Sequence, residues 1–322
     1  MIDALNISAL PVPTYDERRA PVMKLATIRD GRELLVVAVN EGFARPIGEV
    51  LPALSAEART DMVALIREVG APALRHEPLT GGKSLSSESL LAPIPHPPRN
   101  IFCVGKNYTS HAREFSSSGF DASSLPTDDL PTDPIIFTKP GTAVSAPFAD
   151  IPLVPGLDDA VDYEAELGVV IGTGGRFISR ADAMKHVFGY TVINDVTARD
   201  LQKRHKQWFL GKGIDGFCPM GPWIVTADEL DPRSLEVSCT VNGEPRQRGQ
   251  TGDMIFDIPA LIETISKSLT LTPGDIIATG TPEGVGVGFN PPRFLKENDV
   301  VECSVSGIGT IRNTVRRMSP RS

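Results

Sequence analysis

Residues 162–172 read DYEAELGVVIG, and this stretch is the best single guide to both the fold and the function of the chain. Successive side chains of a β-strand point to opposite faces, so in a strand Asp162, Glu164 and Glu166 would share one face. The apolar run VVIG continues the strand into buried character. The pattern therefore predicts several carboxylates that point together beside a buried strand.

Asp195 adds a further carboxylate, because it ends a second apolar run, VFGYTVIND, at residues 187–195. Crowded carboxylates are unfavourable unless they are solvated, protonated or gathered around a cation. Ligands that are all oxygen suit a hard divalent ion such as Mg²⁺, Mn²⁺ or Ca²⁺. A solvated acidic edge is the alternative, since exposed carboxylates are the norm. The apolar setting of both runs favours the metal site.

The composition is that of a globular protein. Hydrophobic residues make up 41% and charged residues 22% of the 322 residues, which excludes a disordered or fibrous chain. The net charge of -8 argues against a protein that follows a nucleic-acid backbone, although a small anionic substrate remains compatible with it. No run approaches the ~18 apolar residues that would span a bilayer, and the first residues do not resemble a secretory signal. We expect a cytoplasmic location and no membrane partner.

The four cysteines are predicted to be buried, reduced thiols. Cys103, Cys218, Cys239 and Cys303 are widely separated, have apolar neighbours and form no C-x-x-C pair. Zinc-ribbon and thioredoxin-type sites are therefore weak interpretations.

The first part of the chain predicts a small domain. Residues 1–20 resemble a loose arm, and residues 23–40 hold two short apolar runs around Asp30-Gly31, which indicates a hairpin. Residues 55–70 show apolar positions at helical spacing, with Gly70 placed to cap the helix.

Closely spaced prolines at residues 90–100 predict an extended linker, which divides the chain into a small N-terminal α/β domain at 1–92 and a catalytic domain at 93–322. Short β-rich runs dominate the second part and predict a β-rich α+β fold. No G-x-G-x-x-G or P-loop motif indicates a nucleotide cofactor. The helices expected in this part cover residues 179–187, 198–206 and 257–269.

His111 and Glu114 are the best candidates for a general base. They lie three residues apart, so one helical turn would place them on the same face, where a carboxylate can orient an imidazole. An ordinary surface pair is the alternative. The polar segment 113–134 follows them and predicts either a lid over a cleft or a disordered surface loop.

Lys212 and the glycine-rich run at residues 279–288 are weaker candidates. Lys212 follows an aromatic pair, and a lysine in a partly dry pocket can bind a carboxylate or an enolate oxygen. A solvated surface lysine is the alternative. The glycines of TGTPEGVGVG would let backbone N–H groups approach a ligand, and Thr281 offers a hydroxyl.

In combination the motifs resemble the fumarylacetoacetate hydrolase family, from about residue 100 to 315. The motifs are, in order, K-N-Y-x-x-H-x-x-E, F-T-K-P, E-x-E-L, N-D-x-T-A-R-D-x-Q, K-x-x-D-x-F-C-P-x-G-P, N-G-E-x-R-Q and T-G-T-P-x-G-V-G. The resemblance implies a mixed β-sandwich or roll as the catalytic domain and a homodimer. It also implies that Glu164, Glu166 and Asp195 ligate a metal, usually Mg²⁺, with Mn²⁺ or Ca²⁺ as further options.

The same resemblance implies roles for the other candidates. His111 and Glu114 match a dyad that activates water, and the segment after them matches a lid. Gln202 and Lys212 match family residues that line the site. Thr281 matches the threonine that holds a substrate carboxylate. Lys106 stands where relatives carry Lys or Arg, and Lys139 is either a pocket residue or a structural one.

The preferred function is hydrolysis of a carbon–carbon bond in a small 2,4-diketo acid of the acylpyruvate or fumarylpyruvate type. The metal would chelate the oxo acid, His111 would deprotonate water, and Lys212, Gln202 and the metal would stabilise the oxyanion and the pyruvate enolate. Decarboxylation of oxaloacetate-like acids and isomerisation of unsaturated oxo diacids, such as 2-hydroxyhepta-2,4-diene-1,7-dioate, use the same enolate and are the alternatives. A non-catalytic protein that binds metal and an oxo acid is a third possibility.

Overall fold

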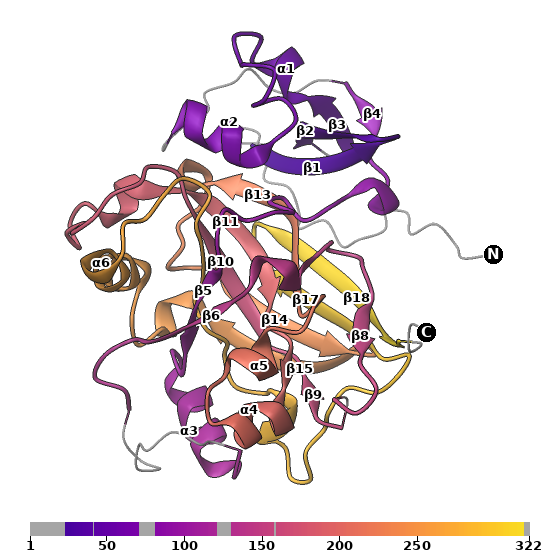
Figure 1. Ribbon diagram of the computed structural model, residues 1–322, viewed down its shortest axis with the longest axis vertical. Helices are drawn as coiled ribbons and strands as arrows, with labels where there is room; N and C mark the ends of the chain where they lie inside the picture. The colour runs from indigo at the N-terminus through magenta and orange to yellow at the C-terminus, as the bar shows by residue number, and fades with distance from the viewer. Residues whose placement is uncertain (1–22, 41, 71–80, 121–129, 158, 319–322) are drawn as a thin grey trace.

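A computed structural model describes residues 23–40, 42–70, 81–120, 130–157 and 159–318. The loose arm expected at residues 1–20 lies outside the described residues. Two β-sheets organise the chain, and the N-terminal strands and helices lie together at one end of it (Figure 1).

The larger sheet is mixed and has eleven strands. Ten of them follow one another as β4 (Lys83–Ser84), β3 (Phe43–Pro46), β2 (Glu33–Asn40), β1 (Lys24–Asp30), β13 (Cys218–Thr226), β11 (Val187–Asn194), β10 (Ala165–Ile171), β16 (Ile276–Ala278), β5 (Ile101–Gly105) and β6 (Ile135–Lys139). The eleventh, β7 (Val144–Ser145), pairs with β13. The pairs β16–β5 and β13–β7 are parallel and the others are antiparallel.

The second sheet has five strands, in the order β15 (Glu244–Gln250), β14 (Glu236–Val241), β17 (Val300–Val305), β18 (Gly309–Arg317) and β8 (Ile151–Leu153). A small ladder joins β9 (Val161–Asp162) to β12 (Thr197–Ala198). The α-helices are α1 (Ile47–Val50), α2 (Met62–Val69), α3 (Thr109–Ser117), α4 (Arg199–His205), α5 (Phe209–Lys212) and α6 (Ile258–Ser268). Short 3₁₀ helices cover Ser87–Ser89, Gly141–Ala143, Ala183–His186, Ala227–Glu229, Thr251–Asp253 and Gly286–Gly288.

The two sheets pack face to face, which confirms the β-rich α+β fold with a mixed β-sandwich. Strand β10 contacts β14 and β17 of the second sheet, and strand β11 contacts β17 and β18. Leu167, Val169 and Ile171 of β10 belong to the core between the sheets, whereas Val170 belongs to the core on the other face. A strand that is buried on both faces needs apolar residues at successive positions, which explains the run VVI.

The N-terminal elements continue the large sheet. The predicted hairpin is confirmed as β1 and β2, with Asp30 opposite Glu33. Helix α2 begins after Asp61, whose side chain accepts a hydrogen bond from Ala64 N, and it ends at Gly70 as expected. Strand β1 pairs with β13, and one apolar core includes residues from both sides of the predicted boundary. The division at residue 92 stays a prediction.

The other local predictions are confirmed to different extents. No helix or strand covers residues 91–100, as the prolines predict, and helices α4 and α6 lie where expected. The helix expected at 179–187 is wrong except for one 3₁₀ turn, Ala183–His186. The segment 113–134 is not all loop, because α3 runs to Ser117. Residues 121–129 of that segment lie outside the described residues.

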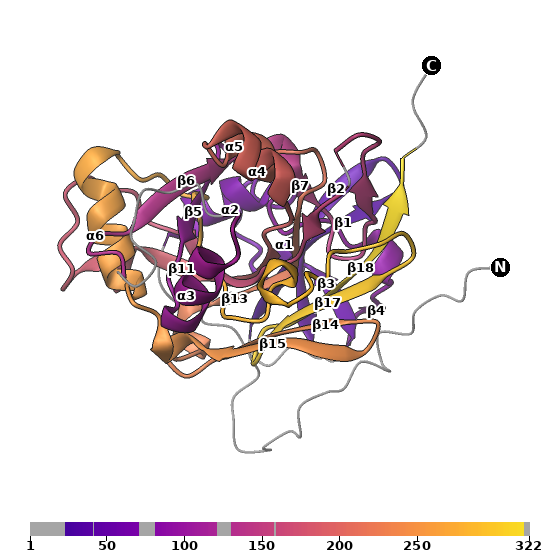
Figure 2. The ribbon, with the colours of Figure 1, turned by 90° about the horizontal axis from the view of Figure 1, so that it is seen from below.

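Helices α3 and α4 lie at the end of the sandwich away from the N-terminal strands, and a view from below shows them with α5 in front of the sheets (Figures 1 and 2). In the described part of the chain, no helix is both long and apolar enough to cross a bilayer.

Candidate active site

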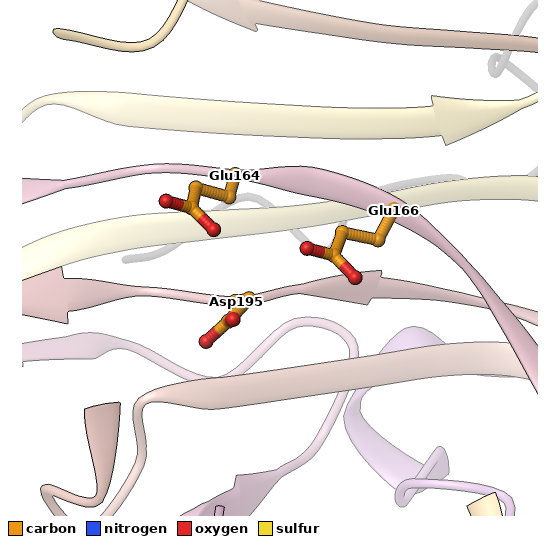
Figure 3. Close-up of side chains that lie close together, drawn as sticks. All are labelled: Glu164, Glu166 and Asp195. Atoms are coloured by element: carbon orange, nitrogen blue, oxygen red, sulfur yellow. The ribbon is translucent and has the colours of Figure 1, made fainter. Parts of the chain in front are cut away.

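Three buried carboxylates lie close together where strand β10 begins and strand β11 ends, and Figure 3 shows their side chains. Ligand oxygens of Glu164, Glu166 and Asp195 lie within 4.8 Å of one another, and each side chain is buried. Glu166 is on β10 opposite Ile193 of β11, and Asp195 directly follows β11. The backbone N–H of Asp195 donates to the carbonyl of Glu164 over 2.8 Å, which fixes the two chain segments side by side.

Asp162 does not join this cluster, so the expectation from strict alternation is wrong at that position. Residues 163 and 164 separate β9 from β10, and the period of two is interrupted there. The Asp162 carboxylate instead accepts hydrogen bonds from the backbone N–H of Gly286 at 2.6 Å and of Val287 at 3.0 Å. It also pairs with Nε of Arg199 at 2.9 Å.

Three buried cations balance the carboxylates. Lys212 Nζ donates to Glu164 Oε2 at 2.6 Å and to Asp195 Oδ2 at 2.7 Å. Lys139 Nζ donates to Asp195 Oδ1 at 2.6 Å and to the Val196 carbonyl at 3.0 Å. Arg199 Nη2 lies 2.7 Å from Glu164 Oε1. Each metal-site carboxylate except Glu166 is thus held by a cation of the protein.

These contacts set the ionisation of the two glutamates in opposite directions. Burial alone would raise the pKa of Glu164, but Lys212 and Arg199 outweigh it and lower the pKa to about 2. Burial raises the pKa of Glu166 well above its usual range, and repulsion by Asp195 and Glu164 adds to the rise. The Glu166 carboxylate accepts one hydrogen bond, from Gly280 N at 2.8 Å.

The donor set fits a hard divalent cation. It consists of carboxylate oxygens, which Mg²⁺ and Mn²⁺ favour, and it contains no thiolate or imidazole. Among the described residues no cation of the protein forms an ion pair with Glu166, and a divalent cation would supply its counter-charge.

His111 and Glu114 lie on α3 and face each other. The distance from His111 Nδ1 to Glu114 Oε2 is 3.3 Å, and the histidine is buried. Glu114 also accepts hydrogen bonds from Gly284 N, at 3.0 Å and 3.2 Å to its two oxygens. The carboxylate therefore links the helix to the glycine-rich loop and holds one nitrogen of the imidazole.

One cavity collects most of the candidate residues. It has a volume of about 20 Å³, where ~10–15 Å³ suffices for one water. Neither Glu114 nor Asp195 lines it, although each contacts a residue that does. The candidates that line the cavity are Lys106, His111, Glu164, Glu166, Gln202, Lys212 and Thr281.

The glycine-rich loop binds carboxylates of the protein. Backbone N–H groups of Gly280, Gly284 and Gly286 donate to Glu166, Glu114 and Asp162, respectively. The Thr281 hydroxyl donates to the Ala165 carbonyl at 2.8 Å and accepts from Gln247 Nε2 at 2.7 Å. With its only proton engaged, that hydroxyl has none to donate to a substrate carboxylate.

Two further residues belong to the site: Arg199, to which the sequence assigned no role, and Lys139, for which it left two roles open. Arg199, inside the motif N-D-x-T-A-R-D-x-Q, is 1% exposed and joins Asp162 to Glu164. It also donates to Gln202 Oε1 at 3.2 Å. Lys139 does not line the cavity, and its ammonium group contacts Asp195 Oδ1. These two facts favour a structural role for Lys139 over a role in the pocket. The remaining lining is apolar or glycine, namely Val104, Gly105, Phe115, Phe137 and Trp208.

Comparison with known proteins shows the family of this chain. The family described as "Fumarylacetoacetate (FAA) hydrolase C-terminal" matches residues 100–316. Oxaloacetate tautomerase YisK of Bacillus subtilis (strain 168) is 50% identical over 233 residues, which cover 72% of this chain and 74% of that protein. The human mitochondrial oxaloacetate tautomerase FAHD2A is 45% identical over 233 residues, 71% of this chain and 70% of that one.

Solved structures share the fold. A fumarylacetoacetate hydrolase from Exiguobacterium antarcticum superposes with a TM-score of 0.76 at 38% identity and covers 92% of this chain and 100% of its own. The maleylpyruvate hydrolase of Sphingobium sp. SYK-6, solved with manganese(II) and pyruvate, gives 0.68 at 31% identity with the same coverage.

Proposed function

Because this chain belongs to the fumarylacetoacetate hydrolase family, we propose that it is an enzyme that interconverts the enol and keto forms of a small oxo diacid, with oxaloacetate as the expected substrate. The observation that carries the proposal is the imidazole of His111, which lines the same small cavity as Glu164 and Glu166. Two relatives named oxaloacetate tautomerase, at 50% and 45% identity, support the choice of substrate.

The metal site would bind the oxo acid. Glu164, Glu166 and Asp195 would hold a divalent cation, Mg²⁺ or Mn²⁺, which when bound polarises the oxo group and offsets the charge of the acid. Lys212 keeps one ammonium hydrogen beyond its bonds to Glu164 and Asp195, and that hydrogen is available to a substrate oxygen.

Gln202 and Lys106 line the cavity and would contact the distal carboxylate. Thr281 would contribute through its backbone N–H or methyl group, since its hydroxyl proton is engaged.

His111 would move the proton. In the enol form a hydroxyl stands on C2, and conversion to the keto form removes that proton and adds one to C3, with no net change. Glu114 holds the Nδ1 side of the ring, so Nε2 is the nitrogen left to serve the substrate. Nε2 takes the proton from the C2 oxygen and returns it to C3. General acid–base catalysis of this kind contributes about 10²–10⁴ in rate.

A tautomerisation assay tests the proposal. Enol oxaloacetate is mixed with the protein and Mg²⁺ or Mn²⁺, and the loss of enol absorbance is compared with the spontaneous rate. We expect a metal-dependent acceleration. A rate equal to the spontaneous one with either metal would refute the proposal.

Hydrolysis of a 2,4-diketo acid is the second candidate. The His111–Glu114 pair favours it, because such a pair can deprotonate water, and the structural relative solved with pyruvate is a maleylpyruvate hydrolase. Pyruvate release from acetylpyruvate under the same conditions would identify it, and pyruvate from oxaloacetate would identify decarboxylation. The expected homodimer and cytoplasmic location stay predictions, the first open to sedimentation analysis.

A further inference from the structure

Three aromatic side chains form the apolar wall of the cavity. Phe115 comes from α3, Phe137 from β6, and Trp208 directly precedes α5. The Trp208 ring lies 6.2 Å from Phe115 and 5.1 Å from Phe137 between centroids, at interplanar angles of 87° and 76°. Both pairs thus pack edge to face, which is a favourable arrangement for aromatic rings.

Trp208 lies directly on the backbone of strand β5. A Cβ built on Gly105 would lie 2.3 Å from Cζ3 and 2.7 Å from Cη2 of the indole. Gly105 is the last residue of β5 and itself lines the cavity. The absence of a side chain at this position therefore provides the space in which the indole lies.

The cavity is too small for the proposed substrate as it stands. Its volume of about 20 Å³ is roughly that of one or two waters, far less than a four-carbon diacid needs. Among the charged lining residues, Lys212 and Arg199 are each held by two carboxylates. The half-buried Trp208 has apolar contacts, which are more easily rearranged than buried ion pairs.

We propose that Trp208 is the specificity-determining residue of this site, and that its indole limits the length of the oxo acid that the cavity admits. The inference rests on the proposed function, because it concerns the same substrate. The distal carboxylate would stay with Gln202 and Lys106, whereas the additional carbons of a longer acid would pack against the apolar aromatic wall. The position of the indole over Gly105 then decides how long the distal group can be.

The first experiment changes the size of residue 208. Turnover of oxaloacetate, and of acylpyruvates with increasing acyl length, is compared in wild type, Trp208→Phe and Trp208→Ala. One methylene in an apolar pocket changes kcat/KM by about 10–200-fold, so we expect Trp208→Ala to shift the ratio toward longer acids by at least about 10-fold. Trp208→Phe should give a smaller shift and serves if the alanine variant does not fold. An unchanged ratio in a folded variant would overturn the inference.

The second experiment needs no turnover. The chain has two tryptophans, and Trp223 is separate from the cavity, with its indole N–H donating to the Ile308 carbonyl at 2.6 Å. Trp223→Phe therefore leaves Trp208 as the only indole fluorophore. Oxalate with Mg²⁺ should change the emission of Trp223→Phe and leave that of Trp208→Phe unchanged.

Calorimetry of oxalate binding, carried out beside the fluorescence measurement, distinguishes a failure of the Trp208 inference from a failure of the proposed function. Oxalate binding without a change in Trp208 emission would overturn the role of Trp208 and leave the proposed function intact. If neither method detects oxalate binding, the result would count against the binding site itself, and so against both the role of Trp208 and the proposed function.

Discussion

Gly288 lies against the carboxylate of Glu114, so closely that a Cβ built on the glycine would lie 2.0 Å from Oε1 and 2.1 Å from Cδ. Glu114 in turn orients His111, so the alignment of the imidazole depends on a residue without a side chain. Gly288→Ala should displace Glu114 while the metal carboxylates stay in place. Misplacement of about 1 Å can cost 10²-fold, and we expect kcat to fall about 10- to 100-fold in steady-state assays.

Gly141→Ala is the matched control. A Cβ at Gly141 would lie 3.6 Å from Cδ of Pro97, which is ordinary van der Waals contact. This variant should retain wild-type kcat. Unchanged kcat in Gly288→Ala would show that the contact between Glu114 and His111 does not limit the reaction.

His111→Ala tests the proton carrier. We expect kcat to fall by about 10²–10⁴, because general acid–base catalysis is lost, whereas Mn²⁺ affinity measured by calorimetry should change little. The ring does not belong to the carboxylate cluster, which explains the separation of the two effects. His96→Ala, at an exposed position, controls for the loss of any imidazole. Wild-type turnover in His111→Ala would refute the assignment.

Features set by neighbouring residues could be predicted from the sequence. The hairpin at residues 23–40 follows from alternation and a turn dipeptide, and Gly70 was identifiable as a helix cap. Glu164, Glu166 and Asp195 could be grouped from the apolar runs beside them and from the family resemblance, and the structure places the two strands as neighbours in the sheet.

Features set by long-range contacts could not be predicted. Asp162 fits the alternation of its segment, yet it binds Arg199, 37 positions away, and the loop at residues 286–287, more than a hundred positions away. Arg199 carries no local pattern that predicts a buried ion pair. Trp208 acquires its place from Gly105, and no rule of spacing connects the two residues. The helix expected at 179–187 failed because tertiary context overrides local periodicity.

Arg199→Met should destabilise the fold. Arg199 is buried between Asp162 and Glu164, and its removal leaves two buried carboxylates with less compensation. Breaking a buried pair costs about 3–5 kcal/mol, measurable by urea unfolding. Arg180→Met is the control, because the pair of Arg180 with Asp257 is exposed and contributes ~0–1 kcal/mol. Equal, small losses in both variants would show that the Arg199 pairs contribute no more than a surface pair.

The cysteines should resist alkylation in the folded state. Burial raises the pKa of Cys218 from the ordinary 9.0 to about 12, and it also raises the pKa of Cys103. Iodoacetamide at pH 9 should therefore label all four buried thiols in urea and none in the native protein, as read by mass spectrometry. Rapid labelling of the native protein would contradict the burial of these thiols.

The raised pKa of Cys218 also affects the free energy of unfolding. Between pH 9 and 12 the unfolded Cys218 thiol ionises while the folded one keeps its proton. The folded state then binds more protons, so the contribution of this residue to the free energy of unfolding should decrease as the pH rises through that window. Cys218→Ala should show a shallower decrease in urea unfolding. An equal slope in wild type and variant would contradict the shift.

Glu166→Gln should have opposite effects with and without a cation. Without metal, an amide relieves the repulsion from Glu164 and Asp195 and can still accept from Gly280 N, so the melting temperature should stay equal or rise. With Mg²⁺ or Mn²⁺ at about 100 times Kd, binding stabilises the wild type by about 2.7 kcal/mol. The variant has lost one anionic ligand, and we expect most of that stabilisation to disappear in thermal-shift measurements. Glu57→Gln, an exposed position, should keep the full metal-dependent shift. A full shift in Glu166→Gln would show that Glu166 is not a ligand, whereas a lower melting temperature without metal would show that its charge is already compensated.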